Sequence, residues 1–127
     1  MSFKSGDTFL LPLGIPKQRE HLWFVLTDPD SSNQFLAVNL THYEVFKDQT
    51  VVLSAGHPFI TKRSLIEYPA AQLMSVDAIN QALACGMAVM KEPCPLPLLK
   101  TIREGLLKSE EPPQEMQDYL KTRCAGA

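Results

Sequence analysis

The sequence has few residues of the types that hold metals or form disulfides. It contains three histidines and three cysteines among 127 residues. The histidines are scattered and the cysteines form no C-x-x-C pair, whereas a zinc site needs four converging ligands at close spacing. We therefore expect no metal, no cofactor and, at Cys85, Cys94 and Cys124, free thiols of the kind found in a reducing cytoplasm.

Long apolar runs and an excess of one charge are also missing. No apolar run approaches the roughly 20 residues that span a bilayer, and the N-terminus lacks the basic start and apolar stretch of a signal peptide. The formal net charge is −2, which argues against a protein that coats nucleic acid through a broad positive surface. We expect a cytoplasmic protein without a membrane partner, in which a small basic patch could still grip one or two phosphates.

The chain is long enough for one compact domain with one core. Its first part contains apolar runs of strand length, separated by clusters of turn-forming residues. These runs predict strands over 7–13, 22–27, 34–41, 50–54 and 71–76. The second run is apolar enough to be covered on both faces.

The third predicted strand alternates in a way that indicates its core face. Leu36, Val38 and Leu40 share one side of the strand, because successive side chains of a strand point to opposite faces. We predict that these three residues point into the core. The neighbours expected for them come from the second and fourth strands: Trp23 or Val25, and Val52.

The pattern changes after Ser75. Residues 77–84 are predicted to form a short helix, and residues 98–108 carry apolar side chains at helical spacing. Pro113 opens a last predicted helix. Strands first and helices last predict a mainly β fold with C-terminal helices. We expect a single domain over 1–127, with a small barrel over about 5–76 and a helical part over about 77–122.

The most informative segment follows the predicted fourth strand. Gly56 can adopt a positive φ and Pro58 ends a strand, so the chain must turn here. A titratable imidazole, two cations and a phenol come at or just past this turn: His57, Lys62, Arg63 and Tyr68. This combination suits an anionic ligand better than a core. The alternative is an ordinary polar surface turn.

The order of these features resembles a known protein family. The features are Gly6-Asp7 before an apolar strand, a polar loop, the run 23–26, a third strand over 37–41 that ends in Thr41, and a closing helix with Ile102 and Leu106. This order resembles the PemK/MazF/Kid toxins of bacterial toxin–antitoxin modules, and 56–68 resembles a PemK-like branch with a His-Pro-Phe motif. The classical members carry Arg-Pro where this chain has His21-Leu22.

The resemblance implies an SH3-like barrel that forms a homodimer, binds an acidic antitoxin protein and cleaves single-stranded RNA. Cleavage without a metal needs a base, an acid and a cation. Arg19, Glu20 and His21 would supply one of each from one loop, and Thr41 would hydrogen-bond a phosphate. The segment 57–68 would then bind RNA through His57, Lys62, Arg63 and Tyr68.

Other interpretations stay open. Arg19 and Glu20 could be a solvated pair of little energetic value, and Thr41 could simply be a strand former. SH3-like barrels host many functions, so a non-catalytic module that binds a peptide or nucleic acid is the alternative. The missing Arg-Pro signature and the low net charge favour that alternative. An inactive or antidote member of a gene pair is a third hypothesis.

Overall fold

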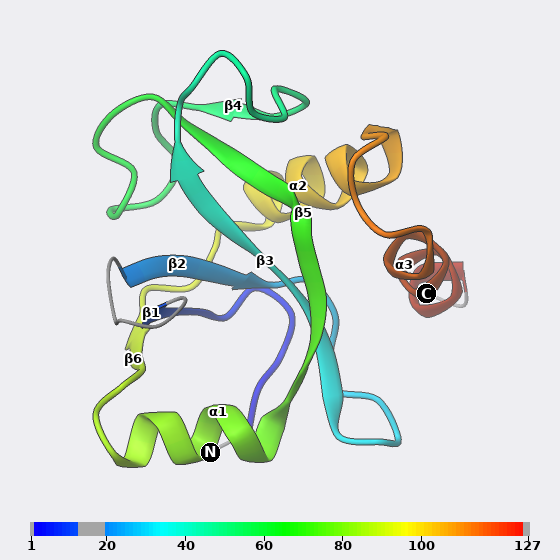
Figure 1. Cartoon of the computed structure of the whole chain (residues 1–127). Coiled ribbons are helices and arrows are strands. Elements are labelled where there is room, and N and C mark those ends of the chain that lie inside the picture. Colours follow the sequence, from blue (N-terminus) through cyan, green and yellow to red (C-terminus); the bar gives the residue numbers. More distant parts are fainter. Residues whose placement is uncertain (1, 13–19, 126–127) are drawn as a thin grey trace.

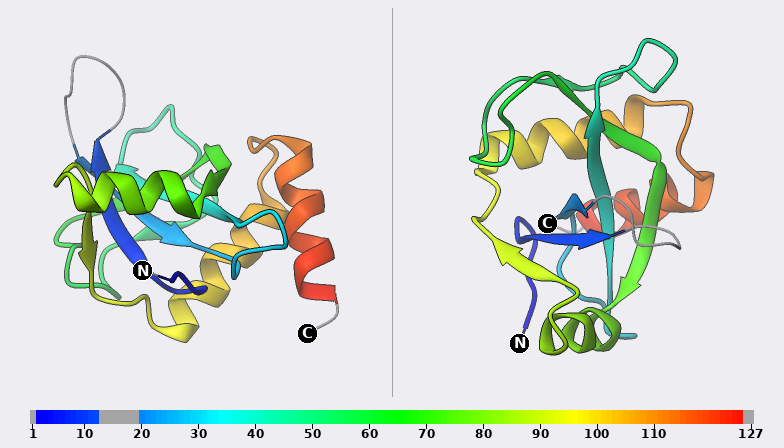
Figure 2. Two further views of the ribbon diagram at one scale, coloured as in Figure 1. Left: turned by 90° about the horizontal axis from the view of Figure 1, so that it is seen from below. Right: turned by 60° about the vertical axis from the view of Figure 1, so that its left-hand side comes forward.

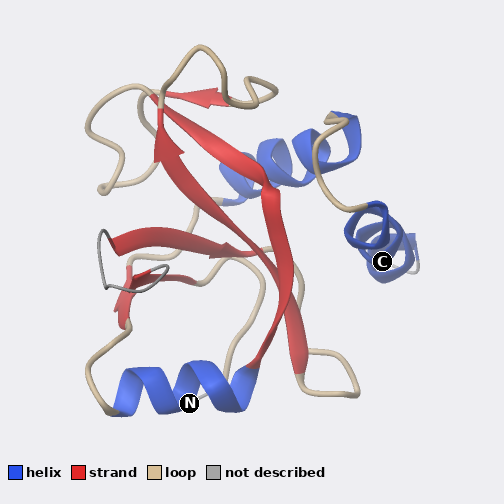
Figure 3. Cartoon of the chain, in the orientation of Figure 1, coloured by secondary structure: helices blue, strands red, loops and turns tan. Residues whose placement is uncertain are grey.

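Six strands form one antiparallel sheet in the computed structural model of the chain, which describes residues 2–12 and 20–125. Across the sheet, the strands come in the order β4-β5-β3-β2-β1-β6. Their bounds are β1 Thr8–Pro12, β2 Glu20–Val25, β3 Gln34–His42, β4 Val52–Leu53, β5 Ser64–Ser75 and β6 Val89–Lys91. Figure 3 shows the strands in red and the helices at the margins of the sheet.

The sheet is strongly curved, and it remains open. The two longest strands, β3 and β5, run side by side along the molecule, and β2 and β1 continue the sheet from β3 (Figure 1). The short strands β4 and β6 form the two edges and do not pair with each other. The prediction of a mainly β fold is confirmed, and the sheet amounts to a half-barrel.

The three helices of the described residues all come after β5, as predicted after Ser75. They are α1 Val76–Ala84, α2 Leu96–Lys108 and α3 Gln114–Ala125. The side-chain oxygen of Ser75 accepts a hydrogen bond from the N–H of Ala78 and so caps α1. Figure 2 shows α1 at one end of the curved sheet, whereas α2 and α3 lie away from that end.

The sequence prediction missed two pieces of the sheet. Strand β5 begins at Ser64, well before the predicted start at residue 71. Strand β6 lies between α1 and α2, inside the segment that the sequence predicted as helical. Its three residues pair with Thr8–Leu10 of β1. A three-residue strand is too short to produce a recognisable alternation.

The first hydrophobic cluster lies between one face of the sheet and helices α2 and α3. Leu36, Val38 and Leu40 belong to it, so the predicted core face of the third strand is confirmed. The sheet residues pack here against α2 and α3 through Leu99, Ile102, Leu106 and Leu120.

The prediction of which residues pack beside this face of β3 is wrong. Trp23 and Val25 are buried in the second cluster, on the other face of β2, because odd and even residues of a strand point to opposite faces. Val52 is exposed, and its neighbour Val51 occupies the core instead.

The second cluster covers the opposite face of the sheet. Phe3, Phe9 and Phe35 meet there, with ring centroids 5.2 to 6.2 Å apart. Val76 and Ile79 of α1 pack against this cluster. Both faces of β2 and β3 are therefore buried, which explains the nearly continuous apolar character of these strands.

Polar contacts fasten the C-terminal helices to the sheet. Tyr119 of α3 donates a 2.8 Å hydrogen bond to Asp30 in the β2–β3 turn. At the other end of the sheet, the carboxylate of Asp48 accepts a hydrogen bond from Ser109, which follows α2. Asp48 also accepts from the N–H of Thr50 at 2.9 Å, which shapes the loop between β3 and β4.

Candidate functional site

A groove of about 810 Å³ lies where three segments of the chain meet. These are the start of β2, the end of β3 and the segment that leads into β5, which lie together on the left of Figure 1. The groove brings together Glu20, His21, Thr41, Lys62 and Arg63, which sequence analysis had selected from three separate parts of the chain.

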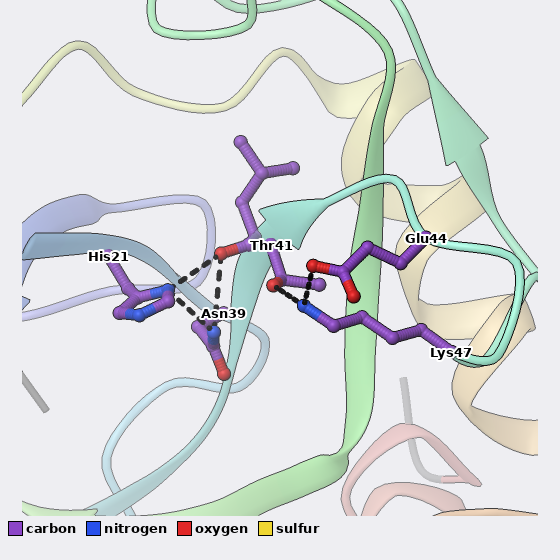
Figure 4. A network of polar contacts seen from close by, with 6 residues as sticks. His21, Asn39, Thr41, Glu44 and Lys47 are labelled. Carbon is purple, nitrogen blue, oxygen red and sulfur yellow. Dashed lines mark hydrogen bonds and ion pairs between the residues drawn. The ribbon is translucent and has the colours of Figure 1, made fainter. Parts of the chain in front are cut away.

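His21 is a half-buried titratable group of the groove. Its Nδ1 lies 3.1 Å from the carbonyl oxygen of Leu40, and the side-chain nitrogen of Asn39 lies 3.2 Å from the same oxygen (Figure 4). Nδ1 also lies 3.3 Å from the side-chain nitrogen of Asn39. Because a carbonyl oxygen only accepts, we assign the shorter contact as a hydrogen bond that Nδ1 donates to Leu40. Nε2 makes no hydrogen bond to the described residues. Nε2 can therefore take up or release a proton without loss of the bond that orients the ring.

Glu20 is exposed and opens β2, directly before His21. Both side chains border the groove. They leave the strand on opposite faces, since adjacent residues of a strand alternate. The groove passes the start of β2, where a ligand can contact both.

Thr41 is buried at the end of β3 and contacts a cation that sequence analysis did not select. The ammonium group of Lys47 donates a 2.8 Å hydrogen bond to Thr41 Oγ1 (Figure 4). Lys47 also lies 3.7 Å from the carboxylate of Glu44. The only local signal for this arrangement is the acid–lysine pair three residues apart. Its approach to Thr41 depends on how the loop folds back.

The groove also combines aromatic rings with cations. The guanidinium carbon of Arg63 lies 4.0 Å from the centre of the Tyr43 ring, which is a cation–π contact. Phe59 lines the same groove, with 40% of its surface exposed. Lys62 is exposed beside it. Sequence analysis missed Tyr43 and Phe59, although an aromatic residue within a polar turn was the signal available for Phe59.

Two residues predicted to bind RNA are buried and lie outside the groove. His57 is buried and uses both ring nitrogens: Nε2 donates to the carbonyl oxygen of Glu92 at 2.6 Å, and Nδ1 accepts from the N–H of Phe59 at 3.0 Å. Tyr68 is fully buried in β5 and donates a 2.8 Å hydrogen bond to the carbonyl oxygen of Ile102 in α2. Burial raises the pKa of Tyr68 far above its usual range. Neither residue lines the groove.

The prediction for Arg19 falls outside the described residues. Among residues 2–12 and 20–125, no group of three or more His, Cys, Asp or Glu side chains could hold a metal ion. Over the same ranges, none of the helices combines the length and the apolar character that a membrane crossing requires.

No family model matches the chain, and no curated protein matches it. These comparisons therefore add no function to what the groove and the order of strands and motifs indicate.

Proposed function

We propose that the groove binds single-stranded RNA and cleaves it without a metal ion, through attack of a 2′-hydroxyl on the adjacent phosphate. The observation that carries the proposal is the state of His21. Its Nδ1 is anchored to Leu40, and its Nε2 makes no bond to the described residues in a groove that also holds Thr41, Lys62 and Arg63.

The reaction needs one proton acceptor and one proton donor. The carboxylate of Glu20 removes the proton from the 2′-hydroxyl, whose oxygen then bonds to phosphorus. The bond from phosphorus to the 5′-oxygen breaks, and the Nε2 proton of His21 passes to that leaving oxygen. The products are a 2′,3′-cyclic phosphate and a free 5′-hydroxyl. The cations of the groove stabilise the charge that accumulates on the phosphate oxygens.

The groove also has the elements of a binding surface for unpaired bases. Aromatic side chains stack on bases of any sequence, and cations follow the backbone. Phe59 is partly exposed, and Tyr43 carries Arg63 on its face. A single strand with unstacked bases fits this surface better than a duplex, whose bases are already stacked.

The broader assignment is a toxin of a toxin–antitoxin module with an SH3-like barrel, a homodimer and an acidic antitoxin partner. Its support is the resemblance in the order of strands and motifs, together with a mainly β half-barrel. Expression of the protein without a partner should then arrest growth, and co-expression of the neighbouring acidic protein should relieve the arrest.

The direct test is incubation of purified protein with a labelled single-stranded oligoribonucleotide in the presence of a chelator. We expect cleavage with 2′,3′-cyclic phosphate ends, and no cleavage of the 2′-O-methyl form of the same strand. His21→Ala should reduce the rate by about 100-fold or more, the usual loss for an acid–base group. An intact RNA pool after incubation with the wild-type protein would refute the catalytic proposal.

A non-catalytic SH3-like binding module is the second candidate. The observation that favours it is that Glu20 and His21 leave β2 on opposite faces. This makes it harder for both side chains to reach the same phosphodiester. This candidate predicts that the oligoribonucleotide or a peptide binds and that no product forms. Gel analysis of the bound strand distinguishes the two candidates.

A further inference from the structure

The Thr41 hydroxyl has a proton with no recipient among the described residues. A hydroxyl group offers one hydrogen and two lone pairs, whereas an ammonium group can only donate. The 2.8 Å contact therefore places a Lys47 N–H against a lone pair of Thr41 Oγ1. No other hydrogen bond joins this hydroxyl to residues 2–12 or 20–125. The Thr41 proton is thus left to donate to something else.

The position of Thr41 shows where that recipient would lie. Thr41 lines the groove, and Lys47 does not. Lys47 approaches the hydroxyl from the loop after β3, and its side chain is 21% exposed (Figure 4). A positive charge on one side of a hydroxyl makes its hydrogen a stronger donor on the other side. A negatively charged oxygen in the groove is the partner that gains most from this arrangement.

We propose that Lys47 is the second member of a phosphate-binding subsite at Thr41, the residue whose phosphate contact the sequence already predicts. The Thr41 hydroxyl donates to a non-bridging oxygen of a phosphodiester, and Lys47 is a positioning residue that orients and polarises this hydroxyl. The inference rests on the proposed function for its ligand, an RNA backbone. Lys47 does not line the groove, so the lining residues alone do not assign it a role. It acts on the ligand through its hydrogen bond to the Thr41 hydroxyl.

Glu44 supplies an internal check on this assignment. Its carboxylate lies 3.7 Å from the Lys47 ammonium group and is 42% exposed. It draws part of the positive charge away from Thr41, and it repels an incoming phosphate. Removal of this charge should therefore strengthen the subsite, whereas removal of Lys47 should weaken it.

The experiment uses a fluorescent 2′-O-methyl oligoribonucleotide, which cannot be cleaved, and measures its dissociation constant by anisotropy. Thr41→Val and Lys47→Met should each weaken binding about tenfold, the usual effect of losing one hydrogen bond to a charged group. Lys47→Arg should restore most of the affinity, and Glu44→Gln should tighten binding. Lys108→Met, which removes the same charge from the exposed end of α2, is the matched control.

A double-mutant cycle separates a positioning role from a structural one. If Lys47 acts through Thr41, the double variant Thr41→Val/Lys47→Met should bind no more weakly than either single variant. Fully additive losses, or equal affinities for Lys47→Met and Lys108→Met, would overturn the inference. Thermal melting of each variant establishes that it is folded before its affinity is compared.

The outcomes also distinguish this subsite from the proposed cleavage. Binding that depends on Lys47 while unmodified RNA stays intact would support the subsite and refute the nuclease. Cleavage that proceeds with normal affinity in Lys47→Met would support the nuclease and refute the subsite. A wild-type protein that does not bind the strand would refute both.

Discussion

His57 lies with its Nε2 2.6 Å from the carbonyl oxygen of Glu92. Through this bond the turn that follows β4 is attached to the segment between β6 and α2. Thr8 of β1 donates to the same carbonyl oxygen at 2.7 Å. The hydrogen bond between His57 and Glu92 therefore holds in place the turn that brings Phe59, Lys62 and Arg63 to the groove.

The two histidines should respond differently to substitution. His57→Ala removes two hydrogen bonds in a buried site, so we expect a loss of about 1–3 kcal/mol in the free energy of unfolding. His21→Ala should change stability little, because Asn39 still donates to the carbonyl oxygen of Leu40. Urea denaturation of both variants tests this contrast. A larger loss for His21→Ala would reverse the roles we assign.

Gly105 of α2 should tolerate no side chain. A Cβ atom there would lie 2.1 Å from Tyr68 Oη and 2.5 Å from a methyl group of Val51. Alanine at an open helix position stabilises relative to glycine by about 1 kcal/mol. We expect Gly105→Ala to destabilise instead, by about 1–3 kcal/mol, as overpacked cores do. Thermal melting gives the sign, and Glu104→Ala on the exposed neighbour is the control.

Val51 and Val52 form a matched pair for the position of the core. Val51 is buried, whereas Val52 is 43% exposed. Val51→Asp should unfold the domain or nearly so, because an unpaired buried carboxylate costs several kcal/mol, an order-of-magnitude figure. Val38→Asp should do the same, since Val38 is fully buried. Val52→Asp should melt cooperatively near the wild-type temperature. Equal behaviour of the Val51 and Val52 variants would contradict the fold.

The contact between Tyr119 and Asp30 should depend on pH. The hydrogen bond from Tyr119 lowers the pKa of Asp30 below its usual 3.8, with help from the N–H of Gln34. Burial, followed by this contact, raises the pKa of Tyr119 above its usual 10.0. Asp30 thus stabilises the fold above pH 3.8 and loses this effect as the pH falls further, whereas Tyr119 loses its effect as the pH rises above 10.0.

Comparison of the wild type with Tyr119→Phe tests this pH window. The stability difference between them should be constant at intermediate pH and should shrink in acid. Denaturant titrations at several pH values measure it. A difference that persists unchanged well below pH 3.8 would show that Asp30 is not the partner that matters.

The cysteines of known environment should differ in reactivity. Cys85 is exposed and Cys94 is buried. Burial raises the pKa of the Cys94 thiol to about 11, so its reactive thiolate is scarce at neutral pH. In a Cys124→Ser background, a disulfide reagent should label Cys85 in the folded protein and Cys94 only after denaturant is added. Rapid native labelling of both would contradict the packing around Cys94.

The sequence predicted the parts of the fold that depend on local periodicity. Alternation in β3 placed Leu36, Val38 and Leu40 correctly, and the helical spacing of Ile102 and Leu106 located α2. It could not place Trp23, since a strand buried on both faces gives no sign of which residues face which helix. The start of β5 was missed because Glu67 and Pro69 make that half look like a loop.

The candidate site was predicted in part for a similar reason. Residue type marked Glu20, His21, Thr41, Lys62 and Arg63, and the groove unites them. The same criterion also selected His57 and Tyr68, whose partners Glu92 and Ile102 are distant in sequence. A titratable residue near a turn looks the same in sequence whether it faces a ligand or a buried carbonyl group.

Lys47 and Asp48 are neighbours in the chain, yet they serve different parts of the molecule. Lys47 contacts Thr41 in the groove wall, and Asp48 holds Ser109 after α2. One peptide bond therefore joins the ligand site to the scaffold, and an insertion or deletion there would disturb both. Evolution of a new ligand preference has more freedom on the other wall, over residues 58–63, where most side chains face solvent. Homologues should accordingly keep the length of the 43–51 loop while they diverge in the opposite wall.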